Sequence, residues 1–280
     1  MTQVREAIGE ACHAGLQRLD AQILLLHALD RPRHDRAWLI AHDQDELDAT
    51  ALQRYRTLCA QRGDAVPLAY LVGWRAFYGL DLRVDPRVLD PRPDTEALVD
   101  WALSLPGLPP HACVADLGTG SGAVALALKS QRPQWQVHAC DASPAALQVA
   151  SANASRLGYA LPLHLGHWLR ALPAHLRLDL IVANPPYLRV HDPHLAALRH
   201  EPPQALVAGP DGLQALREII GSAGAWLQPG GWLLLEHGHD QAAPVRDLLQ
   251  AGGFADIQSR KDLAGIERCS GGWHAGQPAL

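Results

Sequence analysis

An α/β fold, with a sheet covered by helices on both faces, is predicted by two features of this 280-residue chain. From residue 111 onward, short apolar runs alternate with segments of helical periodicity, which is the pattern of a parallel sheet packed between helices. A glycine-rich turn from Gly118 to Gly122 follows the first of these runs and leads directly into a helical segment. Such a turn lets a ligand approach the backbone at the N-terminus of a helix.

The individual elements follow from the same periodicity. Apolar runs predict strands at 112–117, 135–140, 161–165, 178–183 and 231–236, with a terminal pair near 255–260 and 268–273. Helices are expected at 122–131, 144–157, 212–227 and 241–251. Together these elements predict a mixed, mostly parallel sheet of seven strands in a Rossmann-like arrangement.

The residues before this region predict two smaller parts. Residues 1–66 carry apolar positions at a spacing near 3.6, so we expect a small helical bundle. Residues 67–95 form the predicted linker, with a β-hairpin around Pro67 to Val84, and residues 96–280 form the main domain. At the end of the linker, Asp94 or Thr95 is expected to cap the next helix.

Composition and charge exclude several classes of protein. The net charge of −5 gives no general attraction to a nucleic-acid backbone or an anionic membrane. The five cysteines are odd in number and never spaced as CxxC, so we expect neither a disulfide framework nor a metal site. No apolar run approaches the roughly 18 residues of a membrane span, and a cytoplasmic location is predicted.

The segment Asn184-Pro185-Pro186-Tyr187 follows the apolar run at 178–183 and carries the chemistry. Two prolines stiffen the backbone, so the Asn184 carboxamide and the Pro185 carbonyl offer two acceptors at one fixed angle. This pair suits a planar –NH2 group, because both N–H bonds are held while the nitrogen faces a third reactant. Tyr187 is expected to form an aromatic wall. The predicted target is an amide or an exocyclic amine.

The glycine-rich turn is the predicted cofactor end of the site. Its residues are Gly118, Thr119, Gly120, Ser121 and Gly122, and the spacing GxGxG points to S-adenosylmethionine because a dinucleotide-binding turn reads GxGxxG. Asp141 ends the next apolar run, where an acidic side chain can accept both ribose hydroxyls. Asp116 stands near the expected ammonium group. Trp168 either stacks on the adenine or simply packs.

Taken together, these segments resemble the PrmC/HemK family of protein-(glutamine-N5) methyltransferases, which modify peptide chain release factors. The resemblance extends over most of the chain and rests on residues Phe77, Pro91 to Glu96, the glycine-rich turn, Asn184 to Tyr187, Asp192 to Leu195 with Glu201-Pro202, Gly209 to Leu213, and Leu233 to Gly238. It implies a class I S-adenosylmethionine-dependent methyltransferase fold.

The resemblance also implies which residues bind which group. S-adenosyl-L-methionine, which leaves as S-adenosyl-L-homocysteine, would lie on Gly118 to Gly122 with its ribose on Asp141 and its adenine on Trp168. The glutamine of a Gly-Gly-Gln tripeptide would be held by Asn184, Pro185, Pro186 and Tyr187. The family commonly has Asp before the tryptophan, whereas this chain has His167. The resemblance therefore does not decide whether this residue contacts the adenine.

Other functions share part of this pattern. A nucleic-acid methyltransferase can hold a base amino group in the same way, but residues 1–95 have 12 Arg against 14 acidic residues and no interleaving of aromatic and basic residues. A methyltransferase acting on a ribosomal-protein glutamine shares the Asn184 segment. A non-enzymatic cofactor-binding scaffold and a dehydrogenase fit less well. A release factor is therefore the expected partner, with no nucleic-acid substrate and no membrane.

Overall fold

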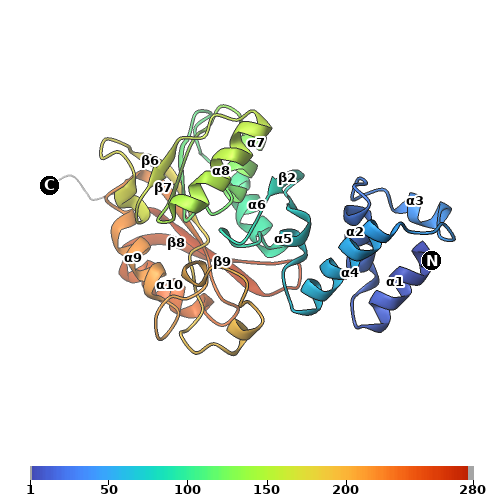
Figure 1. Ribbon diagram of the computed structural model, residues 1–280. Helices are drawn as coiled ribbons and strands as arrows, with labels where there is room; N and C mark the ends of the chain where they lie inside the picture. Colours follow the sequence, from blue (N-terminus) through green and yellow to red (C-terminus); the bar gives the residue numbers. More distant parts are fainter. Residues whose placement is uncertain (1, 277–280) are drawn as a thin grey trace. The chain divides into compact units, whose positions relative to one another are not determined.

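The computed structural model describes residues 2–276, and the chain divides into two units, Met1–Trp74 and Arg75–Leu280 (Figure 1). The N-terminal unit is helical. Its helices are α1 (Val4–His13), α2 (Arg18–Ala28), α3 (Arg36–Ala41), α4 (Ala49–Gly63) and α5 (Leu68–Val72). Leu24, Leu25, Leu26 and Tyr55 are fully buried in its core, which explains the apolar spacing seen in the sequence.

The hairpin expected from residue 67 begins as a helix, so this part of the prediction was wrong. Helix α5 follows Pro67, and its two buried residues Ala69 and Val72 stand three apart, as on one helix face. Gly73 ends it in the left-handed region at a φ of 77°. The hairpin itself is shorter and consists of β1 (Trp74–Phe77) and β2 (Leu80–Arg83).

The second unit contains the predicted mixed sheet of seven strands, in the order β5-β4-β3-β6-β7-β9-β8. The strands are β3 (Cys113–Leu117), β4 (Gln136–Asp141), β5 (Leu163–Leu165), β6 (Leu178–Ala183), β7 (Leu227–Glu236), β8 (Phe254–Lys261) and β9 (Glu267–His274). Strands β3 to β7 pair in parallel, and β9 runs antiparallel to both of its neighbours. The fold class predicted from the sequence is confirmed.

Helices cover both faces of this sheet (Figure 1). Helices α6 (Glu96–Ser104), α7 (Ala123–Gln131) and α8 (Pro144–Leu157) share one core, and α9 (Gln214–Ala223) and α10 (Ala242–Ala251) share the other. In β6, Leu180 and Val182 belong to the first core while Ile181 and Ala183 belong to the second. A strand buried on both faces reads as a continuous apolar run.

Helix α9 and the start of helix α6 (Glu96–Ser104) differ from expectation. Helix α9 is shorter than 212–227 because Leu227 already pairs with Leu178 and starts β7. Helix α6 begins at Glu96, and neither Asp94 nor Thr95 caps it with a side chain. Asp94 instead lies 3.8 Å from Arg268, and the Thr95 hydroxyl accepts a hydrogen bond from the Asn184 side chain.

The strand order places the predicted motifs at one edge. Leu117, which precedes the glycine-rich turn, pairs with Cys140 on β4 and with Ala183 on β6. Asp141, the last residue of β4, and Asn184, which follows β6, therefore lie at the carboxyl end of the sheet. The chain order reverses at β3, and ligands of open α/β sheets bind at such a switch point.

Candidate active site

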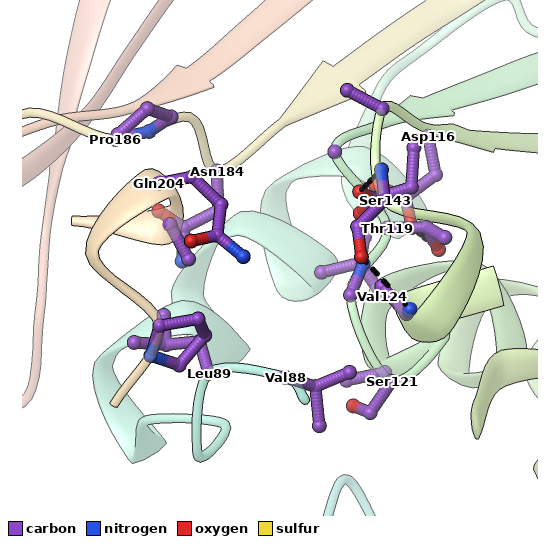
Figure 2. A pocket seen from close by; sticks show the side chains of 18 of the residues that line it. Val88, Leu89, Asp116, Thr119, Ser121, Val124, Ser143, Asn184, Pro186 and Gln204 are labelled. Atoms are coloured by element: carbon purple, nitrogen blue, oxygen red, sulfur yellow. Dashed lines mark hydrogen bonds between the residues drawn. The ribbon is translucent and has the colours of Figure 1, made fainter. Parts of the chain in front are cut away.

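A cavity of about 500 Å³ opens at this edge of the sheet. Figure 2 shows Asn184 and Gln204 on one side of it and Thr119, Ser121 and Ser143 on the other. Its volume lies in the range of pockets that bind small molecules and cofactors. The two motifs that are far apart in the sequence thus face the same space.

Backbone hydrogen bonds fix the glycine-rich turn to strand β4. The N–H groups of Gly118 and Thr119 both donate to the Cys140 carbonyl at 2.9 Å. Gly118 adopts a φ of 73°, and a Cβ there would lie 3.2 Å from Cζ3 of Trp168. Glycine is needed at this position because a side chain would be strained and would press on the tryptophan ring. Gly122 ends the turn and is the one residue of the five that does not line the cavity.

Asp116 lies beneath the turn and lines the cavity. Its carboxylate accepts hydrogen bonds from the Thr119 hydroxyl at 2.6 Å and from the Ala125 N–H at 3.1 Å. Burial raises the pKa of Asp116 to about 6, although these two hydrogen bonds oppose the shift. A cationic group bound beside this carboxyl would favour its ionised form.

Asp141 is fixed by backbone donors on both sides. One carboxylate oxygen accepts from the Gly120 N–H at 2.9 Å, and the other accepts from the Ser143 N–H at 2.8 Å. Each carboxylate oxygen has a second lone pair, so both can accept a further hydrogen bond from a ligand. Asp141 also lines the cavity, and it is therefore an acceptor with a predetermined orientation.

Trp168 and His167 line the cavity next to the turn. Trp168 has a φ of 47°, which is unusual for a residue with a large side chain. Its indole N–H donates to Glu218 at 3.1 Å, so the ring is held in place beside Gly118. Strain of this kind persists where the surroundings fix the conformation, as they often do at functional sites.

The Asn184 segment forms the opposite wall. Asn184 and Pro186 line the cavity, while Pro185 is buried and Tyr187 is half-buried outside the lining. The Asn184 side chain donates from Nδ2 to the Thr95 hydroxyl at 3.2 Å. Gln241 holds the end of the segment, since its Nε2 donates to the Tyr187 carbonyl at 3.1 Å and to the Gly212 carbonyl at 3.3 Å.

The comparisons with known proteins agree with this geometry. Residues 4–73 match the PrmC N-terminal domain, and residues 101–251 match the methyltransferase small domain. The release factor glutamine methyltransferase of Burkholderia pseudomallei is 49% identical over 265 residues, covering 92% of each chain. The chain belongs to the release factor glutamine methyltransferases.

Two further relatives extend the picture. The Bordetella pertussis member of the family is 47% identical over 275 residues, covering 98% of this chain and all of its own length. A 16S rRNA methyltransferase of T. thermophilus, solved with AdoMet and guanosine, matches with a TM-score of 0.54 and 21% identity. The match covers 72% of this chain and 49% of the T. thermophilus protein, and it shows that the two share a fold.

Sequence reasoning missed two segments that complete the cavity of this methyltransferase. Residues 87–89 and Pro91 line it from the linker, and residues 202, 204 and 205 line it from the loop after β6. Arg92 joins these two segments, because its guanidinium binds the buried carboxylate of Glu201 and lies 3.5 Å from Asp90. The resemblance to the family included Pro91, Arg92 and Glu201-Pro202, but a single sequence gave no signal that these residues meet.

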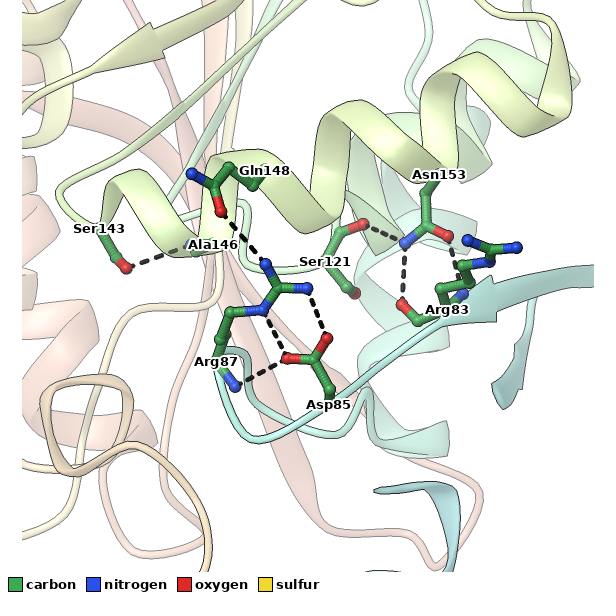
Figure 3. Close-up of polar contacts among 8 residues, drawn as sticks. All are labelled: Arg83, Asp85, Arg87, Ser121, Ser143, Ala146, Gln148 and Asn153. Atoms are coloured by element: carbon green, nitrogen blue, oxygen red, sulfur yellow. Dashed lines mark hydrogen bonds and ion pairs between the residues drawn. The ribbon is translucent and has the colours of Figure 1, made fainter. Parts of the chain in front are cut away.

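Asn153 ties the hairpin to the glycine-rich turn (Figure 3). Its side chain accepts from the Arg83 N–H at 2.7 Å and donates to the Arg83 and Ser121 carbonyls, each at 2.9 Å. Nearby, Arg87 reaches from the linker to Asp85 at 2.8 Å and to Gln148 on α8 at 3.2 Å. The methyltransferase thus uses α8 to position the linker beside the cavity.

Residues 2–276 contain neither a cluster of potential metal ligands nor a candidate membrane-spanning helix. Nowhere in this range do three or more His, Cys, Asp or Glu side chains gather as a metal would require. The helices described there are also too short or too polar to cross a bilayer.

Proposed function

We propose that this protein transfers a methyl group from S-adenosyl-L-methionine to the side-chain amide nitrogen of the glutamine in the Gly-Gly-Gln motif of peptide chain release factors. The observation that carries the proposal is the placement of Asn184. It directly follows β6 and faces a cavity whose other wall is the glycine-rich turn after β3. Membership in the family supports the same reaction.

The residues around the cavity fit S-adenosylmethionine. Gly118 to Ser121 provide a close backbone approach, Asp141 offers two oriented acceptors for ribose hydroxyls, and Trp168 provides an aromatic face for adenine. We assign Asp116 to the ammonium group. When bound, S-adenosylmethionine supplies an electrophilic methyl group and becomes S-adenosylhomocysteine. The T. thermophilus relative, solved with AdoMet, supports this cofactor.

The protein contributes mainly orientation and charge stabilisation. An amide nitrogen is a poor nucleophile, so holding it in line with the reacting carbon supplies much of the rate, up to about 7–11 kcal/mol. We assign the Asn184 and Pro185 carbonyl oxygens to the two N–H bonds of the substrate amide. Their partial negative charge stabilises the positive charge that grows on the nitrogen. The proton leaves after the transfer, and no strong base is needed.

Pro186 and Tyr187 complete the proposed substrate site. Pro186 lines the cavity beside Asn184, and its ring gives the flat carboxamide an apolar surface. We assign Tyr187 to the outer wall, where it excludes water from the glutamine. Burial raises the pKa of the Tyr187 hydroxyl, so the ring stays neutral at physiological pH.

Methylation of purified release factor with labelled S-adenosylmethionine tests the proposal. We expect label on the release factor and none on a variant whose Gly-Gly-Gln glutamine is replaced. DNA, ribosomal RNA and ribosomal proteins serve as competing substrates in the same assay. Label on the nucleic acids or the ribosomal proteins, with none on the release factor, would overturn the assignment.

A further inference from the structure

Glu236 is a buried carboxyl group behind Asn184 to which the proposed reaction gives no role. It is the last residue of β7. The parallel register pairs Ala183 of β6 with Leu235 of β7, so the next residues along these neighbouring strands, Asn184 and Glu236, lie side by side. Its side chain is 1% exposed. Among residues 2–276, its Oε2 atom has no hydrogen-bond partner. A buried carboxylate that is only partly satisfied is costly, which suggests a functional reason for its presence.

The polar groups around Asn184 are arranged around this carboxyl. The Asn184 side chain donates to the Thr95 hydroxyl at 3.2 Å. Thr95 and Asn184 also act on Glu236, and both favour its ionised form against the effect of burial. An ionised carboxylate only accepts hydrogen bonds, and a hydroxyl that donates to it keeps its oxygen lone pairs for Asn184.

We infer that Glu236, acting with Thr95, is the positioning residue that fixes which way the Asn184 carboxamide faces. A carboxamide can rotate by 180°, which exchanges the positions of its oxygen and its –NH2 group. The Thr95 hydroxyl accepts from the –NH2 group of Asn184, and the ionised Glu236 on the neighbouring strand favours the same orientation, so the Asn184 oxygen faces the cavity, where the substrate amide needs an acceptor. The inference rests on the role proposed above for Asn184.

Protonation of Glu236 reverses this preference, because a protonated carboxyl can donate to the carboxamide oxygen. Burial raises the pKa of Glu236 to about 7. The charged and titratable groups that act with it are Arg268, Asp94, Tyr187 and Cys269. Burial raises the pKa values of the Tyr187 hydroxyl and the Cys269 thiol, so both stay neutral while Glu236 titrates. We expect kcat to rise between pH 6 and pH 8 as Glu236 ionises.

Glu236→Gln tests the inference in the full-length enzyme with release factor as substrate. Its amide can donate to the Asn184 oxygen, which favours the orientation with the Asn184 –NH2 group toward the cavity. We expect kcat to fall at least about 10-fold, the scale of one hydrogen bond to a charged group, and to lose its rise between pH 6 and pH 8. The KM for S-adenosylmethionine and the melting temperature should stay close to those of the parent. Glu267→Gln, on the neighbouring strand β9, is the matched control and should leave kcat unchanged.

A second pair of variants separates positioning from a general structural role. In Asn184→Asp, two carboxyl groups face each other, so kcat should be low. Adding Glu236→Gln supplies a donor to the new carboxylate, whose other oxygen still faces the cavity as an acceptor. We expect kcat to rise at least about 5-fold in this background, although the same change lowers it in the parent. A merely structural Glu236 would lower kcat in both backgrounds.

Thr95→Val provides an independent measurement should the Glu236 variants unfold. It keeps the side-chain volume and removes the hydroxyl that accepts from the Asn184 –NH2 group, so it should lower kcat more than it weakens cofactor binding. A kcat within twofold of the parent for Glu236→Gln or Thr95→Val, or no increase in the Asn184→Asp background, would overturn the inference alone. A parent enzyme that leaves release factor unlabelled would instead refute the proposed function, and this inference with it.

Discussion

Asn153 offers a direct test of how the linker is coupled to the glycine-rich turn. Its side chain is fully buried and makes three hydrogen bonds, all to backbone groups of Arg83 and Ser121. Asn153→Ala removes all three and leaves the buried Ser121 carbonyl without this donor. At about 1 kcal/mol for each hydrogen bond, the free energy of unfolding should fall by about 3 kcal/mol.

The measurement is denaturant or thermal unfolding combined with calorimetric titration of S-adenosylmethionine. A loss of about 3 kcal/mol corresponds to a fall in melting temperature of about 6–12 °C for a unit of this size. We also expect cofactor affinity to fall about 10-fold, because the hydrogen bond to Ser121 fixes one wall of the cavity. Ser151→Ala, at an exposed position of the same helix α8, is the control and should change neither quantity.

Asn153→Asp separates hydrogen bonding from packing, since it keeps the volume and the acceptor but loses both donors. Its carboxylate would face the Arg83 and Ser121 carbonyls, so the loss of stability at neutral pH should equal or exceed that of the alanine variant. An alanine variant within about 1 kcal/mol of the parent, with unchanged cofactor affinity, would refute the coupling.

Four further predictions concern the cavity. Asn184→Ala should lower kcat at least about 100-fold while the calorimetric affinity for S-adenosylmethionine is kept, because it removes one acceptor from the transition state. Asp141→Ala should raise the Kd of S-adenosylmethionine at least about 10-fold, since it removes a charged acceptor, and an unchanged Kd would exclude the ribose contact. Gly118→Ala should cost about 1–2 kcal/mol of unfolding free energy and displace Trp168, visible as a shift in tryptophan fluorescence. The pKa of Asp116 is raised by burial from 3.8 to about 6, so the folded state loses up to about 3 kcal/mol as pH rises through this window, and Asp116→Asn should flatten the stability curve measured there.

The sheet and the two motifs were predictable because local patterns determine them. Each strand buried on both faces is a short apolar run, and β6 was placed at 178–183 with the bounds that the structure has. The glycine-rich turn and the Asn184 segment both end such runs, so a parallel sheet had to bring them to the same edge. The short helix α5 was missed because its five residues are too few for periodicity to distinguish helix from strand.

The polar contacts that support the site were not predictable in the same way. Asp94 or Thr95 was expected to cap α6, because aspartate and threonine are usual capping residues. The Thr95 hydroxyl instead accepts from Asn184, which lies 89 residues away along the chain. Asn153 and Glu236 likewise act on distant residues, and neither stands in a pattern of period 2 or 3.6 that marks a function.

These distant contacts explain why the linker from Arg75 onward belongs to the same unit as the seven-stranded sheet. Residues from Arg83 to Thr95 contact three segments by hydrogen bonds: the glycine-rich turn through Asn153, the loop after β6 through Glu201, and the Asn184 segment through Asn184 itself. A sheet edge alone would leave the cavity open on the side that the linker covers. The polar groups that join the linker to these three segments are buried or half-buried. Loss of any one of these contacts should therefore lower both the affinity for S-adenosylmethionine and the rate of methyl transfer.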